Sequence, residues 1–257
     1  MHVEAGLRTG DLMSPWPEEF NRRIATLSTS LHCAPTEYAA SKLFTEGVRP
    51  ETVGVTGNPV VDALRWTLAK LSAANSSHTS DRPRVVLTAH RRENFGRPLE
   101  NICSAVLELA EKFSNHEFHF ITHPNPQAGP VVRSILDGRS AVRVVPPLSY
   151  PEFISLMAGA RLLISDSGGI QEEAPTLGIP LLVTRESTER PEVVHCGAAE
   201  LVGTDRDHII DRAIAILSRP PGERNPRPNP FGDGRAGERI IEAIVDRFSH
   251  RAGGAEP

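Results

Sequence analysis

The fold is decided by the stretch Ser165-Asp166-Ser167-Gly168-Gly169-Ile170-Gln171-Glu172-Glu173-Ala174-Pro175. The apolar run Arg161-Leu162-Leu163-Ile164 stands before it and is typical of a buried strand. Gly178 and Pro180 follow it and indicate where a helix ends. The pattern therefore predicts a strand, a Gly-Gly turn and a helix.

The two glycines of this turn favour a phosphate site. Glycine lets the backbone approach a ligand without a Cβ in the way, and a helix N-terminus directs N–H groups and a positive dipole end at it. Glu172 and Glu173, which we expect in the first turn, would repel a diphosphate, so we expect Glu173 to turn aside and accept hydrogen bonds from ribose hydroxyls. The alternative is a glycine-rich turn whose acidic residues stabilise the helix N-terminus.

Composition narrows the class of protein. The chain has 257 residues, of which 39% are hydrophobic and 23% charged, as in an ordinary soluble globular protein. Its net charge of −4 indicates neither a nucleic-acid nor a membrane surface. No apolar run approaches the roughly 20 residues of a membrane span, and residues 1–30 lack a signal-peptide pattern. Cys33, Cys103 and Cys196 are far apart, which favours thiols in a reducing cytoplasm, and no His/Cys cluster has metal-ligand spacing.

Residues 1–56 resemble the last part of an α/β domain. The opening Met1–Arg8 is typical of the end of a buried strand that runs into a loop. A complete domain of this kind usually needs more than about 100 residues, so we expect an incomplete one. The elements predicted next are a strand at Leu31–Ala34, a helix at Pro35–Thr45, a strand at Thr52–Thr56, a turn at Asn58–Asp62, a helix that runs to about Leu71, and a linker at Ser72–Pro83.

From residue 84 a regular alternation of strands and helices predicts a parallel, doubly wound sheet. The clearest helices are Leu99–Phe113 and Asp207–Leu217, and an amphipathic helix at Arg235–Phe248 follows a loop at Pro220–Pro230. The predicted strands are Arg84–Ala89, Phe118–Thr122, Val142–Val145, Arg161–Ser165, Pro180–Thr184 and Glu200–Gly203.

Polar residues gather at the predicted carboxyl ends of these strands, where open α/β sheets bind ligands. Such an edge can offer cations and N–H groups to a diphosphate, a carboxylate to a ribose, and an apolar surface to a base, which favours a nucleotide site. Each histidine alone is more often a core or capping group, and Arg91 and Arg92 could be solvated. The segments are His90–Glu93, His123–Pro126, the turn Pro147–Phe153, Ser165–Glu173 and Arg185–Glu192.

A further motif, Gly232–Gly237, matches GxGxxG, but a Pro-rich loop precedes it and not a strand. We interpret it as the start of a helix and not as a dinucleotide fingerprint.

Seven motifs occur in an order that resembles the non-hydrolysing UDP-N-acetylglucosamine (UDP-GlcNAc) 2-epimerases. They are HVEAGLRTGDL (2–12), SPWPEEFNR (14–22), TGNPVVDAL (56–64), TAHRREN (88–94), SDSGGIQEEAP (165–175), STERPE (187–192) and NPFGDGRA (229–236). The resemblance spans residues 2 to about 247. It implies an isomerase of GT-B type, with two Rossmann-like domains and the substrate between them. The activity implied is conversion of UDP-GlcNAc to UDP-ManNAc for surface polysaccharide synthesis, without metal or nicotinamide.

The resemblance also implies a division of the chain and roles for single residues. It implies an incomplete first domain (1–58), a connecting helix and linker (59–83), a UDP-binding domain (84–230), a helix that packs back on the first domain (231–248), and a disordered tail (249–257). The implied mechanism is elimination of UDP followed by its re-addition. The catalytic residues would be Glu4, Glu18 and His90. The UDP-binding residues would be Phe153, Ser167, Gly168, Gly169, Glu173 and Arg190. Arg91 and His123 would belong to a possible site that binds UDP-GlcNAc as an activator. A homodimer is implied for the complete protein.

One departure from the family pattern concerns the start of the chain. The family's first domain begins well before HVEAG, and its early strands, a catalytic aspartate and further basic residues have no counterpart here. We expect that the chain as given is a fragment and does not catalyse epimerisation alone. The alternatives are an inactive UDP-binding chain, a hydrolysing epimerase and a GT-B glycosyltransferase.

Overall fold

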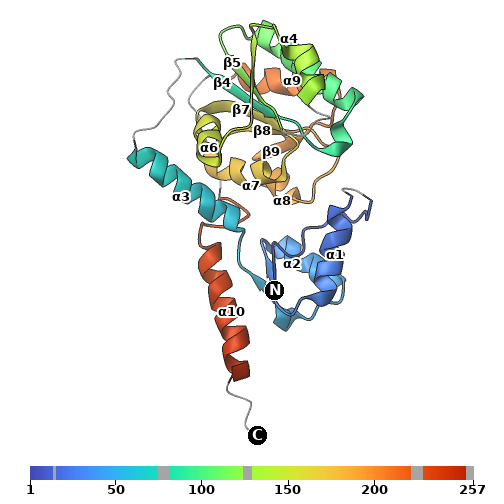
Figure 1. The fold of residues 1–257 in the computed structure, drawn as a ribbon, viewed down its shortest axis with the longest axis vertical. Coiled ribbons are helices and arrows are strands. Elements are labelled where there is room, and N and C mark those ends of the chain that lie inside the picture. The colour runs from blue at the N-terminus through green and yellow to red at the C-terminus, as the bar shows by residue number, and fades with distance from the viewer. Residues whose placement is uncertain (14–15, 75–81, 124–128, 221–227, 253–257) are drawn as a thin grey trace. The chain divides into compact units, whose positions relative to one another are not determined.

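The computed structural model describes residues 1–13, 16–74, 82–123, 129–220 and 228–252, and it divides into two compact units (Figure 1). Unit 1 comprises Met1–Trp66 and Pro228–Pro257, and unit 2 comprises Thr67–Arg227. The boundary falls within helix α3 (Pro59–Ala73). Most of the linker and of the loop expected at 72–83 and 220–230 lies outside the described residues.

Unit 2 is built on a six-stranded sheet in which every neighbouring pair of strands is parallel. The strand order β6-β5-β4-β7-β8-β9 is that of a doubly wound fold, so the predicted class is confirmed. Its strands are β4 (Arg84–Thr88), β5 (Glu117–Ile121), β6 (Val142–Val145), β7 (Ala160–Ser165), β8 (Leu181–Val183) and β9 (Ala199–Leu201).

The direction of winding reverses between β4 and β7. Strands β4, β5 and β6 succeed one another toward one edge of the sheet, and β7, β8 and β9 toward the other. Thr88 at the end of β4 lies opposite Ser165 at the end of β7. The loops that follow these two strands therefore leave the sheet side by side, at the position where open α/β sheets bind their ligands.

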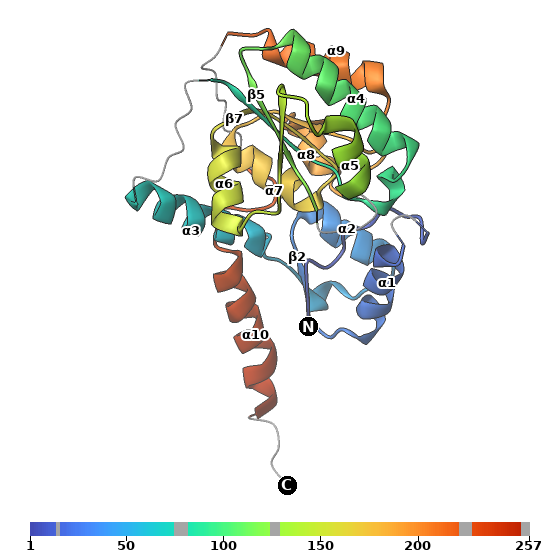
Figure 2. The same cartoon turned by 45° about the horizontal axis from the view of Figure 1, so that its top comes forward.

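Helices cover both faces of this sheet (Figures 1 and 2). The main core lies between the sheet and α4, whose Leu99, Ile102, Val106 and Leu109 recur every three to four positions and are fully buried. One face is covered by α4 (Arg97–Lys112), which packs against α5 (Gly129–Leu136) and α9 (Arg206–Leu217). The opposite face is covered by α6 (Tyr150–Ala158) and α7 (Gly168–Leu177), and α8 (Pro191–His195) contacts α7 and β9. A short 3-10 helix spans Arg92–Asn94.

Unit 1 contains a smaller parallel sheet of order β1-β2-β3, with β2 (His32–Ala34) between β1 (His2–Val3) and β3 (Val53–Val55). Helix α2 (Glu37–Thr45) begins where the Thr36 side chain accepts a hydrogen bond from the Ala39 amide, an ordinary N-cap. Helix α1 (Glu18–Ser28) and a 3-10 turn at Pro50–Thr52 complete the residues before α3.

The terminal helix α10 (Ala236–Ala252) packs on this sheet through Ile240, which contacts Leu31 and Cys33. Its N-terminus is held by Asp62 of α3, whose carboxylate accepts hydrogen bonds from the amides of Ala236 and Gly237 at 3.1 and 2.8 Å. The disordered tail expected from residue 249 is wrong for residues 249–252, which continue helix α10. Among the described residues, no helix is long and apolar enough to cross a membrane.

Candidate functional site

Asp166, directly after β7, joins the two strand ends at which the winding reverses. Its carboxylate is 0% exposed, and one oxygen accepts hydrogen bonds from the backbone amides of His90 (2.9 Å) and Arg91 (2.8 Å) and from the Asn94 side-chain amide (2.9 Å). The loop after β4 is thereby held against the start of α7. Asp166 and Asn94 had no predicted role of their own, although an aspartate immediately after a buried strand was a signal for one.

The imidazole of His90 stacks on that of His123, with ring centroids 4.8 Å apart and planes 14° apart. Its Nδ1 lies 3.3 Å from the second oxygen of Asp166. Burial lowers the pKa of His90, and His123 and Arg91 lower it further, against the opposing effect of Asp166. The ring is therefore neutral at physiological pH and can donate one N–H hydrogen bond. The structure brings the predicted residues His90, Arg91 and His123 together, while Pro124–Pro126 lie outside the described residues.

The N-terminus of α7 is a potential anion site. Ser167 is the N-cap residue, but its side chain does not cap the helix. Within the described part of the chain, the amides of Gly168, Gly169 and Ile170 have no hydrogen-bond acceptor. Our expectation that Glu172 and Glu173 lie in the first turn is wrong, because the helix begins at Gly168 and both belong to its second turn. The N-terminus is therefore free of the carboxylate repulsion that we expected there.

Arg190 lies directly behind Gly168, and a Cβ added at Gly168 would come within 2.7 Å of its guanidinium Nη1. The guanidinium is buried and forms ion pairs with Glu172 and Glu189. Glu189 also binds Arg185 at 2.8 Å. This network fixes the position of the Arg190 guanidinium close to the N-terminus of α7.

Glu173 faces α6 and not the solvent. It is 4% exposed, and its carboxyl group accepts a hydrogen bond of 2.8 Å from the Tyr150 hydroxyl. Burial and the neighbouring charge of Glu172 raise the pKa of Glu173, the Tyr150 hydrogen bond lowers it, and the resulting pKa is about 7. Proton transfer at this carboxyl group is therefore possible near neutral pH.

The segment Pro147–Phe153, expected as a turn, becomes helix α6 from Tyr150 onward. Ser149 and Glu152 form a capping box there, with 2.9 Å from the Ser149 amide to the Glu152 carboxylate. Phe153 is half-buried and stands three positions after Tyr150, on the same side of the helix. Sequence reasoning missed Tyr150, for which the capping box was the available signal.

Two further predicted residues, Glu4 and Glu18, belong to unit 1. Glu4 follows β1 and is the one non-glycine residue with a positive φ, 59°, among the described residues. Its carboxylate accepts a 2.8 Å hydrogen bond from the Asn58 side chain. Such backbone strain occurs preferentially at functional sites.

Glu18 is exposed at the start of α1, whereas Glu19 beside it is fully buried. Glu19 accepts a hydrogen bond from the Thr9 amide and contacts Arg23. Of this acidic pair, Glu18 is therefore the one available to a ligand. In the described part of the chain, no group of three or more His, Cys, Asp or Glu residues is placed to hold a metal ion.

Comparison with known proteins places this site in a family. A family model described as UDP-N-acetylglucosamine 2-epimerase matches residues 1–245. The UDP-N-acetylglucosamine 2-epimerase of Yersinia pestis is 42% identical over 255 residues, which cover 95% of this chain and 68% of the relative. Among solved structures, UDP-GlcNAc 2-epimerase from Neisseria meningitidis bound to UDP-GlcNAc has a TM-score of 0.91 and 39% identity, with 95% and 69% of the two chains covered. S. aureus MnaA solved with UDP has a TM-score of 0.87 and 37% identity, with 96% and 69% covered.

These matches confirm the resemblance that the seven motifs indicated and the α/β class with parallel sheets. They extend over nearly the whole of this chain at about 40% identity. The chain belongs to the UDP-N-acetylglucosamine 2-epimerase family.

Proposed function

We propose that this protein interconverts UDP-GlcNAc and UDP-ManNAc by inverting C2 of the sugar. The observation that carries the proposal is the anion site at the N-terminus of α7, with the buried carboxyl group of Glu173 one turn further along the same helix. In UDP the ribose is bonded directly to the diphosphate, so the two groups need neighbouring sites. Relatives of 37–39% identity have been solved with UDP-GlcNAc or UDP bound.

The UDP moiety would be bound by unit 2. The free amides of Gly168 and Gly169, together with Ser167, would bind the diphosphate, and Arg190 would add positive charge behind them. Ribose hydroxyls would donate to Glu173 in competition with Tyr150. Phe153 would lie against the uracil from the same face of α6 as Tyr150.

The chemistry would proceed by elimination and re-addition. The C2 hydrogen of the sugar is weakly acidic, so a carboxylate removes it as a proton while the C1–O bond breaks and the bonding electrons leave with UDP. The products held in the site are UDP and 2-acetamidoglucal. Protonation of C2 on the opposite face and attack of UDP on C1 then give the epimer, with no net oxidation or loss of atoms.

Glu4 and Glu18 would act as the acid and base in these proton transfers. The negative charge of the diphosphate would favour the protonated imidazole of His90, which could then donate an N–H to the departing group. By the same family resemblance, Arg91 and His123 would contribute to an activator site for a second UDP-GlcNAc, the complete protein would be a homodimer, and the product would serve surface polysaccharide synthesis.

Incubation of the complete protein with UDP-GlcNAc in heavy water tests the reaction. We expect NMR to show UDP-ManNAc and deuterium at C2 of both UDP-sugars. Protium retained at C2 of a UDP-ManNAc product would contradict the elimination, and free ManNAc as the main product would indicate a hydrolysing epimerase.

Calorimetric titration with UDP tests the binding site separately. Replacing Glu173 by alanine should weaken binding by about 1.5–3 kcal/mol, the range for a hydrogen bond to a charged group. The matched control is Glu108→Ala, because Glu108 is a half-exposed carboxylate on α4 that pairs with Arg206. Equal UDP affinity of Glu173→Ala and the control would remove Glu173 from the ribose site. UDP binding without any exchange at C2 would indicate the binding function alone.

A further inference from the structure

The two carboxylate oxygens of Asp166 have different surroundings. Oδ2 accepts three hydrogen bonds from the loop after β4, whereas Oδ1 is buried and accepts no hydrogen bond from the described residues. The Nδ1 atom of His90 lies 3.3 Å from Oδ1, and rotation of the imidazole ring aligns an Nδ1–H with this oxygen. Because a buried carboxylate oxygen without a hydrogen bond is costly, His90 is the donor that this oxygen favours.

The contact with Oδ1 determines which nitrogen of His90 carries a proton. A neutral imidazole has one N–H, and beside a carboxylate oxygen that N–H is favoured at Nδ1. Nε2 then has no proton and is able to accept one. The His90 side chain is 27% exposed and that of Asp166 is 0% exposed, so a ligand can reach the imidazole while the carboxylate stays shielded behind it.

The groups around His90 decide when its second nitrogen takes up a proton. Burial lowers the pKa of His90, the Asp166 carboxylate raises it, and the charges of His123 and Arg91 lower it. The lowering effects prevail in the protein without ligand. A diphosphate near the ring would add negative charge to that of Asp166, and both charges would stabilise the imidazolium.

We propose that Asp166 is a positioning residue: it holds the Nδ1 proton of His90, so that Nε2 takes up a proton from solvent when UDP binds and donates a charged hydrogen bond to the diphosphate. This rests on the proposed function, because it assumes that the diphosphate lies near His90 and the N-terminus of α7. The acceptor would be the phosphate oxygen that receives the bonding electrons when the C1–O bond breaks. A hydrogen bond from a cation to that oxygen strengthens as its negative charge develops.

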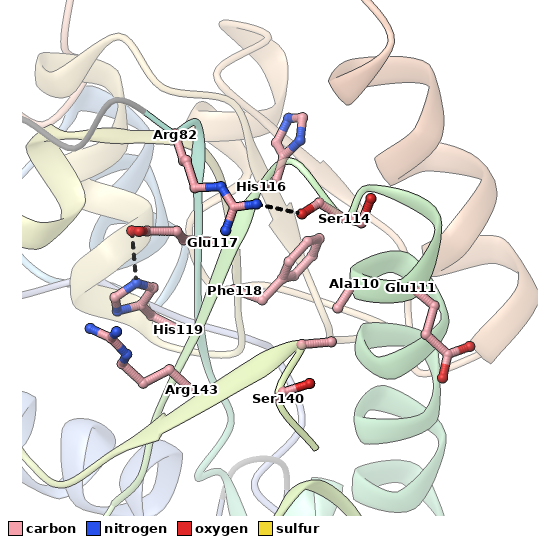
Figure 3. A pocket seen from close by; sticks show the side chains of 11 residues that line it. Arg82, Ala110, Glu111, Ser114, His116, Glu117, Phe118, His119, Ser140 and Arg143 are labelled. Carbon is pink, nitrogen blue, oxygen red and sulfur yellow. Dashed lines mark hydrogen bonds and ion pairs between the residues drawn. The ribbon is translucent and has the colours of Figure 1, made fainter. Parts of the chain in front are cut away.

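A second contact between a histidine and a carboxylate in unit 2 provides a control. At the amino end of β5, Nε2 of His119 lies 3.4 Å from the Glu117 carboxylate (Figure 3). Glu117 is the first residue of β5 and lies opposite Arg84, the first residue of β4, so this pair is at the other end of the sheet from Asp166. It combines the same two chemical groups outside the proposed nucleotide site.

The protonated nitrogen of His90 can be identified by NMR of the protein labelled with ¹⁵N-histidine. Two-bond ¹H–¹⁵N correlation spectra distinguish protonated from unprotonated ring nitrogens, and His90→Gln assigns the signal among the ten histidines. We expect Nδ1 to carry the proton in the free protein at neutral pH, and both nitrogens to carry one at saturation with UDP. A proton at Nε2 in the free protein, or a ring that stays neutral in the complex, would overturn the proposal.

Asp166→Asn tests the carboxylate with little change of shape. The asparagine oxygen can still accept hydrogen bonds from the loop, while its amide N–H faces Nδ1 of His90 and should move the imidazole proton to Nε2. UDP should then bind about tenfold more weakly, or by about 1.4 kcal/mol, the difference between a charged and a neutral hydrogen bond. Glu117→Gln should alter the spectrum of His119 and leave the UDP affinity unchanged.

A double variant separates this role from a merely structural one. If Asp166 acts through His90, Asp166→Asn should cause no further loss of UDP affinity in the His90→Gln background, and a fully additive loss would refute the proposal. If Asp166→Asn does not fold, the tautomer of the parent protein still decides. The free protein reports that tautomer without substrate, so a parent with the expected tautomer but no exchange at C2 would contradict the proposed function and not the contact between Asp166 and His90.

Discussion

Replacing Glu173 by glutamine tests how strongly the fold resists ionisation of this carboxyl group. Glutamine has nearly the same shape as the protonated acid and can still accept the Tyr150 hydrogen bond. The pKa of Glu173 is raised from an ordinary 4.5 to about 7. Each pKa unit corresponds to about 1.4 kcal/mol, so ionising Glu173 in the folded protein costs about 3 kcal/mol.

The sign of the pH dependence follows from this raised pKa. Below the unfolded pKa both states hold the proton, and the contribution of Glu173 to stability is fully present. Between 4.5 and about 7 the unfolded chain loses the proton first, so stability falls as the pH rises. Above the folded pKa both states are ionised and the loss is complete.

Urea unfolding of the parent and of Glu173→Gln from about pH 5 to about pH 8 measures this loss. We expect the free energy of unfolding of the parent to fall relative to the variant by about 2–3 kcal/mol over that range and then to level off. Comparing the two proteins cancels the titration of histidines that they share. Parallel pH profiles would refute the reasoning.

A calorimetric measurement links the same group to the proposed function. Ribose hydroxyls that donate to Glu173 favour its ionised form, so UDP binding near pH 7 should release a proton. The observed binding enthalpy should then depend on the ionisation enthalpy of the buffer for the parent and not for Glu173→Gln. An enthalpy that is the same in all buffers for the parent would contradict the role at the ribose and leave the stability result intact.

Substitutions at three further places have expected outcomes that unfolding measurements can check. Gly168→Ala should destabilise the protein by about 1–3 kcal/mol, because the added Cβ would lie 2.7 Å from the fixed guanidinium of Arg190. Gly169→Ala should be neutral or stabilising, because the nearest atom to its added Cβ is 3.9 Å away. Similar losses of stability for both variants would contradict this. Asp166→Ala leaves three donors without their acceptor and should cost about 3 kcal/mol or more, and a loss below about 1 kcal/mol would show that the donors find other acceptors. Glu19→Gln should lower the free energy of unfolding by about 1–2 kcal/mol, because Glu19 is buried, and Glu18→Gln should lower it by less than about 0.5 kcal/mol, because Glu18 is exposed. A larger loss for Glu18→Gln than for Glu19→Gln would contradict this difference in burial.

The strands and the edge at which their polar residues meet could be predicted because both depend on local patterns. A run such as Arg161–Ile164 followed by a Gly-Gly turn indicates a strand and a turn wherever it occurs. Strand β6 has the same bounds as predicted, Val142–Val145, and most other predicted strands differ from the structure by one or two residues. The first residue of a helix is harder to predict, and an error of one turn placed Glu172 and Glu173 in the first turn of α7, whereas they lie in its second turn.

Motifs and hydrophobic runs in the sequence were sufficient to predict the family, the parallel α/β class and the segments that carry the candidate site, because these patterns are properties of neighbouring residues. The tertiary structure was needed to show which polar groups meet. Asp166 accepts hydrogen bonds from residues more than 70 positions earlier in the chain, and Tyr150 reaches Glu173 from another helix. It also decided which carboxyl group, Glu18 or Glu19, is buried. These outcomes depend on strand order and register, which bring distant residues together and remove them from water. The new neighbours and the burial then determine the charge of each ionisable side chain.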